Sequence, residues 1–167
     1  MIVYHGSTVP VKIPVIMENE RMLDFGVGFY TTSNKEQAIR WSQLVAARRK
    51  ANTCFISEYE FAFEIAENTL EIVFFNKPDS SWLEFVCQNR LGKTPLQNYD
   101  VAMGPVADDQ VYATVLLYEQ GLLSKEAAVG ELKVRKLYNQ VLFHTKRSLD
   151  YCKYIQHFEI EGTSYGK

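Results

Sequence analysis

The 167-residue sequence predicts a mixed α+β domain built on a mostly antiparallel β-sheet. About seven segments have the pattern of strands and four or five have that of helices. These segments do not alternate regularly, which disfavours a doubly wound parallel sheet. Hydrophobic residues make up 47% and charged residues 23%, which is typical of an ordered globular chain. We therefore expect one domain over residues 1–161 and a short tail over residues 162–167.

Composition also excludes several classes of protein. The formal net charge of −2 gives no basic excess, so a nucleic-acid partner is not expected. The three cysteines are odd in number and far apart, which argues against a disulfide scaffold or structural zinc and predicts buried free thiols. The first residues do not resemble a signal peptide and no apolar run has the length of a membrane span. We expect a cytoplasmic protein without a membrane partner.

The first half of the chain begins with a strand over residues 2–4 that runs into His5-Gly6-Ser7. Prolines then mark a loop, and residues 28–32 form the next strand. Residues 33–50 predict a helix with Ser33 and Glu36 as its capping box. Its apolar face comprises Ala38, Trp41 and Val45. Further strands are expected over residues 54–65 and 69–75.

The second half predicts a helix over residues 80–90 with Ser81 and Glu84 as a capping box. A strand over residues 98–106 follows, and Asp108 and Asp109 suit the negative charge that a helix N-terminus favours. The helix that they begin is indicated by the helical spacing of Val111, Val115, Tyr118 and Leu122. The remaining expected elements are a helix at 124–136, a strand at 139–144, a short helix at 145–153 and a strand at 154–161.

The stretch "LDFGVGFYTT" (residues 23–32) combines two glycines with an aromatic pair, which indicates the wall of a pocket. It lacks the full dinucleotide fingerprint, and the chain contains no Walker A motif or nucleophile elbow. His144 and His157 have no metal-ligand spacing, so no metal is expected. His5-Gly6-Ser7 has two interpretations. The Gly6 backbone could pair with a planar amide while His5 and Ser7 bind sugar hydroxyls, or the segment could be a turn that His5 caps.

Three fragments in order, "YHGS", "GFYTT" and "YNQVLFHTKRSLDYCKYI", together resemble the signature segments of the diphtheria-toxin-like ADP-ribosyltransferases. That superfamily includes the poly-ADP-ribose polymerases. Its members carry a His-Gly-Ser strand end, a Gly-x-Tyr strand leading into a helix, and an Asn-Glu-Tyr strand. The stretches "LDFGVGFYTT" and "MGPVADDQVY" also look like those of a poorly characterised bacterial branch. The resemblance extends from Met1 to about residue 160, and it implies split, mostly antiparallel β-sheets with flanking helices.

The resemblance implies a set of NAD-binding residues. The Gly6 backbone would bind the nicotinamide carboxamide, and His5 with Ser7 would bind the adenosine ribose. Tyr30 would pack on the nicotinamide ring, with Trp41 as the second stacking aromatic. Glycines 26 and 28 would clear space for that ring. Ala38 stands where the family often has a serine.

Gln140 stands where the family has its catalytic glutamate, which makes the triad His-Tyr-Gln. A glutamine can orient a ribose but carries no charge and cannot act as a general base. The resemblance implies mono-ADP-ribosylation of a macromolecular acceptor, a protein, by a bacterial toxin or regulator with a neutralising partner protein. A catalytically weak or inactive module that binds NAD or ADP-ribose, and an NAD glycohydrolase, are the alternatives.

Each of these residues also has a plain structural interpretation. Trp41 and Tyr30 could be core residues, and Gln140 could lie on a solvent-facing edge. Asp108 and Asp109 could begin a helix or face an acceptor substrate. Asn89 and Arg90 could touch a phosphate, or could be surface residues at a helix end.

Overall fold

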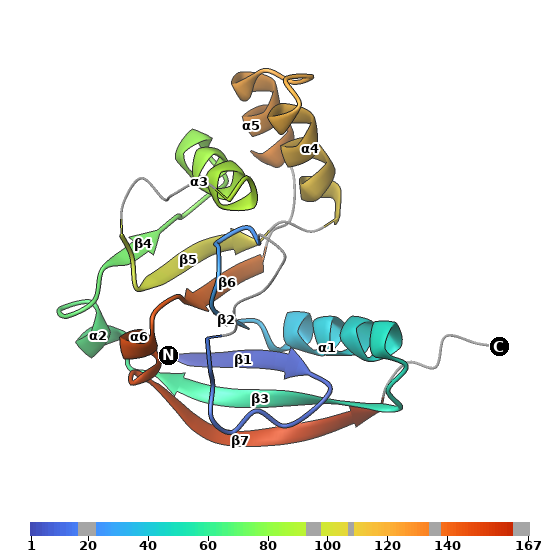
Figure 1. Ribbon diagram of the computed structural model, residues 1–167, viewed down its shortest axis with the longest axis vertical. Coiled ribbons are helices and arrows are strands. Elements are labelled where there is room, and N and C mark those ends of the chain that lie inside the picture. The colour runs from blue at the N-terminus through green and yellow to red at the C-terminus, as the bar shows by residue number, and fades with distance from the viewer. Residues whose placement is uncertain (17–22, 93–97, 107–108, 134–137, 162–167) are drawn as a thin grey trace.

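The computed structural model describes residues 1–16, 23–92, 98–106, 109–133 and 138–161 (Figure 1). The predicted tail and Asp108 lie outside these residues. A seven-stranded sheet has the order β4-β5-β6-β2-β1-β3-β7. The strands are β1 (Ile2–Ser7), β2 (Phe29–Thr32), β3 (Thr53–Phe61), β4 (Ile72–Phe74), β5 (Val101–Val106), β6 (Tyr138–Phe143) and β7 (Cys152–Glu161). The six helices of the described residues are α1 (Lys35–Arg49), α2 (Phe63–Ala66), α3 (Ser80–Arg90), α4 (Asp109–Glu119), α5 (Lys125–Lys133) and α6 (Lys146–Leu149).

Strands β4, β5, β6 and β2 form one well-paired group, and strands β1, β3 and β7 form the other. The two groups join between β2 and β1. Strands β4 and β5 are parallel, and every other neighbouring pair is antiparallel. Strand β1 pairs with β3 through six residues, whereas β1 pairs with β2 only at Tyr4 and Thr32. Figure 1 shows β1, β3 and β7 below, and β4, β5 and β6 above. The predicted α+β class with a mostly antiparallel sheet is confirmed.

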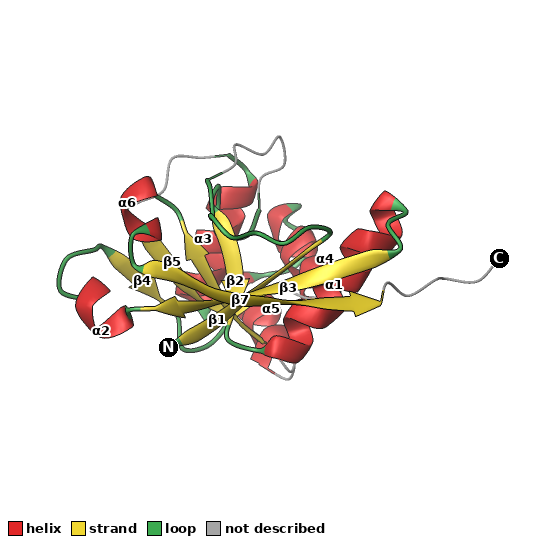
Figure 2. Ribbon diagram, turned by 90° about the horizontal axis from the view of Figure 1, so that it is seen from below, coloured by secondary structure: helices red, strands yellow, loops and turns green. Residues whose placement is uncertain are grey.

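Two hydrophobic clusters lie on opposite faces of the sheet. The first joins Ala102 and Leu142 of the sheet to residues of α3, α4 and α5, including Trp82, whose indole N–H donates to the Pro105 carbonyl at 2.9 Å. The second contains Val101 and Val141, the immediate neighbours of those sheet residues. Alternate residues of a strand face opposite sides, which explains this division. Figure 2 shows the twist of the sheet, with α2 and α6 at the end opposite to α1.

Both predicted capping boxes are wrong, although both helices exist. The Asn34 side chain caps α1 by accepting from the Gln37 N–H, and Asp79 caps α3 by accepting from two backbone N–H groups. Each cap lies within two residues of the predicted serine. Asn34 and Asp79 have extended backbones, which aim their side-chain oxygens at the first helical N–H groups.

Helix α1 buries a different face from the one expected. Its buried residues are Ala38, Ser42 and Ala46, and Trp41 is 50% exposed. These three small residues recur every four positions, which allows α1 to approach the sheet closely. The core interpretation of Trp41 is therefore wrong.

Several element boundaries also differ from the prediction. Strand β1 continues through Ser7, because His5 and Gly6 pair with β3. The expected strand over residues 54–65 stops at Phe61, and the Ala62 N–H donates to the Tyr151 carbonyl just before α2. The three cysteines are free and buried, as predicted. Among the described helices, none combines the length and apolar character that crossing a membrane requires.

Candidate functional site

His5 is fixed at the junction of the two strand groups. Its Nδ1 lies 2.7 Å from the Tyr30 carbonyl oxygen, and its ring packs on Phe29 with centroids 4.6 Å apart. A carbonyl only accepts, so Nδ1 carries the proton and Nε2 retains a lone pair. Burial lowers the pKa of His5, although its bond to Tyr30 opposes the shift. The imidazole is therefore neutral at pH 7 and offers one acceptor atom.

Tyr30 is held at both its backbone and its side chain. Its carbonyl binds His5, and its hydroxyl donates to the Gly26 carbonyl at 2.5 Å. Burial, with a smaller contribution from the Asp24 charge, raises the pKa of the Tyr30 hydroxyl. The phenol therefore remains protonated at physiological pH. The ring is half-buried against the first hydrophobic cluster, which fixes its position.

Gly6 directs its backbone polar groups toward the junction. The Phe61 N–H of β3 donates to the Met1 carbonyl at 2.8 Å. Every second residue of β1, counted from Met1, therefore forms its backbone hydrogen bonds with β3. Since bonding alternates along an antiparallel pair, the N–H and C=O of Gly6 point the other way, toward β2. The pairing of β1 with β2 occurs at Tyr4 and Thr32, two residues before Gly6.

The absence of a side chain at Gly6 has a structural cause. A Cβ atom there would lie 2.4 Å from the Ala38 carbonyl oxygen of α1. We expect Gly6→Ala to destabilise the fold by about 1–3 kcal/mol, because neither backbone can yield easily. Gly130→Ala is the matched control, since a Cβ on this α5 residue meets nothing within 4 Å. Chemical denaturation should show a loss for Gly6→Ala and a gain of about 0.5–1 kcal/mol for the control. Equal stabilities would contradict the close contact.

Glycines 26 and 28 do not clear space for a ligand ring. A Cβ at Gly28 would lie 2.4 Å from the Phe143 carbonyl oxygen, and one at Gly26 would lie 2.8 Å from Asn89 Oδ1. Gly26 also has a φ of +83°, a conformation that favours glycine. Protein atoms therefore occupy the space beside these two glycines, and packing explains why glycine stands at both positions.

Ser7 and Trp41 point to other partners. The Ser7 hydroxyl donates to the Val9 carbonyl and accepts from the Val9 N–H at 3.2 Å, closing a local turn. The Arg48 guanidinium lies 5.7 Å from the Trp41 ring centre. The ring contacts of the described residues do not join Trp41 to Tyr30 directly, so their stacking on a nicotinamide ring stays a prediction.

Gln140 is a buried residue, which corrects the solvent-facing interpretation. It lies on β6 between Thr32 of β2 and Gly104 of β5, and it is 9% exposed. Its amide nitrogen, Nε2, is buried without a hydrogen-bond partner. An unpaired buried donor costs about 1–3 kcal/mol. Such a group is rare in native proteins and requires an explanation.

Strand pairing determines which predicted residues share a face. Tyr4, Thr32 and Gln140 are paired across neighbouring strands and so face the same side. Gly6 and Tyr30 lie two residues from Tyr4 and Thr32, so they share that face. His5 lies on the opposite face and is linked to the others through the Tyr30 carbonyl.

A buried polar layer for which the sequence gives no signal lies beneath the segment that leads into β2. Asn89 is 6% exposed and the Arg90 side chain 10%, so the surface interpretation of this helix end is wrong. Arg90 forms a long ion pair with Asp24 at 3.7 Å, and its guanidinium lies 4.0 Å from the Tyr112 ring centre. Tyr99 donates to the Phe25 carbonyl at 2.7 Å. The helix end gave no sequence signal of burial, because residues far away in the chain cover it.

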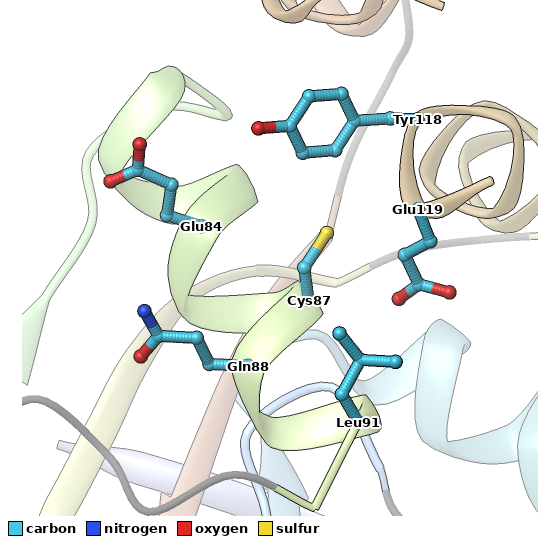
Figure 3. Close-up of a pocket in the computed structure, with 6 residues that line it drawn as sticks. All are labelled: Glu84, Cys87, Gln88, Leu91, Tyr118 and Glu119. Atoms are coloured by element: carbon cyan, nitrogen blue, oxygen red, sulfur yellow. The ribbon is translucent and has the colours of Figure 1, made fainter. Parts of the chain in front are cut away.

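A cavity of about 270 Å³ lies between α3 and α4 (Figure 3). None of His5, Gly6, Tyr30 or Gln140 lines it. Within the described ranges, no three His, Cys, Asp or Glu side chains form a group able to hold a metal ion.

The fold defines an α+β protein with a mostly antiparallel seven-stranded sheet. The chain matches a family model over residues 1–154, and it belongs to that family, DUF3990, whose description is "Protein of unknown function". No curated protein and no solved structure matches the chain.

Proposed function

We propose that this protein is an NAD-dependent mono-ADP-ribosyltransferase. The observation that carries the proposal is the buried Gln140 amide, whose Nε2 has no hydrogen-bond partner. Gln140 shares a face with Tyr30 and Gly6, the residues to which the sequence resemblance assigns nicotinamide binding. A polar ligand at this face would satisfy the unpaired donor. The seven-stranded sheet is continuous, but β1 and β2 pair at one position, which is compatible with a ligand between these strands.

The residues present fit the chemistry of NAD. A carboxamide offers one donor face and one acceptor face, which complement the C=O and N–H that Gly6 directs toward β2. The Nε2 lone pair of the neutral His5 would accept a hydrogen bond from a ribose hydroxyl. The fixed ring of Tyr30 offers a surface for the nicotinamide, and an aromatic pair contributes about 0.5–1.5 kcal/mol beyond burial.

In the proposed reaction, the bond between nicotinamide and the anomeric carbon breaks, and nicotinamide leaves with the electron pair. A bond from that carbon to an oxygen or nitrogen of a protein acceptor forms, and the proton of the acceptor passes to solvent. Positive charge develops on the ribose as the first bond breaks. Gln140 opposes this charge with a dipole rather than a full negative charge, so we expect slow turnover and no polymer formation. A neutralising partner protein is expected if the protein is a toxin.

The second candidate is a module that binds NAD or ADP-ribose without turnover. The neutral side chain at position 140 favours it, because neither His5 nor Gln140 supplies a negative charge. Ala38 also supplies no hydroxyl for the carboxamide.

Nicotinamide release by the purified protein, with and without cell lysate, tests the proposal. We expect His5→Ala to reduce release by at least roughly tenfold, because the ribose loses its acceptor. His157→Ala is the control, since His157 is exposed on β7 and bonds Tyr154. Circular dichroism should show both variants folded.

The outcomes separate the candidate functions. Labelled ADP-ribose appearing in lysate protein would support a transferase. Release without labelling would indicate a glycohydrolase, and calorimetric NAD binding without release would indicate the binding module. No NAD binding by the folded wild-type protein would contradict all three.

A further inference from the structure

The cavity between α3 and α4 is lined by Glu84, Cys87 and Gln88 of α3, by Leu91 directly after α3, and by Tyr118 and Glu119 of α4. Figure 3 shows the Tyr118 ring reaching from α4 toward α3, and the Glu119 carboxylate on the same side of α4. Its volume of about 270 Å³ is below the ~300–1,000 Å³ typical of pockets for drug-sized ligands. The cavity is therefore suited to a side chain or small molecule rather than a dinucleotide.

The two carboxylates of the cavity differ in their partners. Glu84 forms an ion pair with Lys125 of α5, and both side chains are partly exposed. Glu119 Oε1 is buried without a hydrogen-bond partner. Glu119 also accepts from the Cys87 thiol, and burial with the Glu119 charge raises the pKa of that thiol to about 12. The thiol thus remains a neutral donor, and Oε1 of Glu119 is left without a partner.

We propose that this cavity binds a guanidinium group. A guanidinium is planar and charged, so it can donate to a carboxylate while one face stacks on an aromatic ring. Glu119 and Tyr118 supply these two partners in adjacent positions of α4, and the Gln88 amide adds a polar group at the wall. The guanidinium could belong to an arginine side chain of a partner protein or to a free small molecule. This inference is independent of NAD binding.

Arg90 is the cation of this protein that could pair with Glu119 in place of a ligand, because its Nη1 is also buried without a partner. The Arg90 guanidinium is held elsewhere, at 4.0 Å from the Tyr112 ring centre and at 3.7 Å from Asp24. The ion pairs of the described residues do not join Arg90 to Glu119. Arg90 does not line the cavity either.

The test is a titration of the intact protein with ethylguanidinium, followed by the amide NMR signals of α3 and α4. We expect saturation with a dissociation constant of about 1–10 mM. Ethylurea has a similar shape without charge and should bind at least roughly tenfold more weakly. Glu119→Gln should raise the dissociation constant at least roughly tenfold, and Tyr118→Leu severalfold. Glu64→Gln, which removes an exposed carboxylate on α2, should change nothing.

A second titration with N-acetyl-arginine methylamide identifies the source of the group. Tighter binding of this compound than of ethylguanidinium would indicate an arginine of a partner protein, and weaker binding would indicate a small-molecule ligand. Equal binding of ethylurea, or no saturation up to roughly 100 mM, would overturn the proposal. A further outcome would also overturn the proposal: Glu119→Gln and Arg90→Ala both lose stability, and the protein does not bind ethylguanidinium. Arg90 would then be the partner of Glu119.

Discussion

Gln140→Glu is expected to raise the rate of nicotinamide release by roughly tenfold to a hundredfold. The substitution replaces the amide nitrogen by an oxygen and retains the shape of the side chain. Because Nε2 has no hydrogen-bond partner, its replacement breaks no hydrogen bond of that atom. A carboxylate at this buried position would stabilise the positive charge that develops on the ribose more strongly than a neutral amide does. Single-turnover measurement of nicotinamide release under saturating NAD tests this expectation.

Burial creates an opposing effect. Gln140 is 9% exposed, and desolvation raises the pKa of a buried carboxyl group. The gain in rate should therefore increase with pH until the new carboxyl group is ionised. Gln156→Glu is the matched control, because Gln156 is exposed on β7, and its rate should equal that of the wild type. Unchanged release by a folded Gln140→Glu variant that still binds NAD would show that position 140 does not face the ribose.

Secondary structure was predictable wherever local pattern determines it. The eleven residues of α3 match the prediction, because apolar residues recur on one face of the segment and an acidic cap precedes it. Caps were predicted less well, since serine, asparagine and aspartate near a helix start are equivalent in sequence and only backbone geometry selects among them. The short helix α2 was missed because Phe63 continues the alternation of β3, while Ala62 leaves the strand to bond Tyr151.

The strand placement of the candidate residues could be predicted from the sequence, but their surroundings could not. The motif placed Gly6, Tyr30 and Gln140 in the chain, and strand pairing places them on one face. The reasons for glycine at positions 6 and 28 lie in α1 and β6, which are distant in sequence. Burial of Asn89 and Arg90 likewise depends on long-range packing. A single sequence does not contain these distances.

Asp100→Asn is expected to lower the free energy of unfolding at pH 7 by about 2 kcal/mol. The buried Asp100 carboxylate accepts from Arg147 Nε at 2.7 Å, from Arg147 Nη2, from the Thr145 hydroxyl at 2.6 Å and from the Glu71 N–H at 2.9 Å. It thereby joins the segment before β4 to α6. An asparagine retains the shape but replaces one accepting oxygen by a donor, which leaves two donors facing each other.

The same carboxylate makes the fold sensitive to acid. Hydrogen bonds from Arg147, opposed by burial and aided by Thr145, lower the pKa of Asp100 from 3.8 to about 2. A lowered pKa contributes stability above the unfolded value, and that contribution is lost as the pH falls from about 4 to about 2. Urea denaturation across this range should show a smaller decline for Asp100→Asn than for the wild type. The exposed Asp150 provides the control, and its substitution by Asn should leave the decline unchanged. An equal decline in all three proteins would mean that other carboxyl groups control acid unfolding. The Arg147 side chain is 61% exposed, so added salt should screen its charge and weaken the ion pair with Asp100. The hydrogen bonds that Asp100 accepts from Thr145 and Glu71 should remain, so salt should remove only part of the stability that Asp100 contributes.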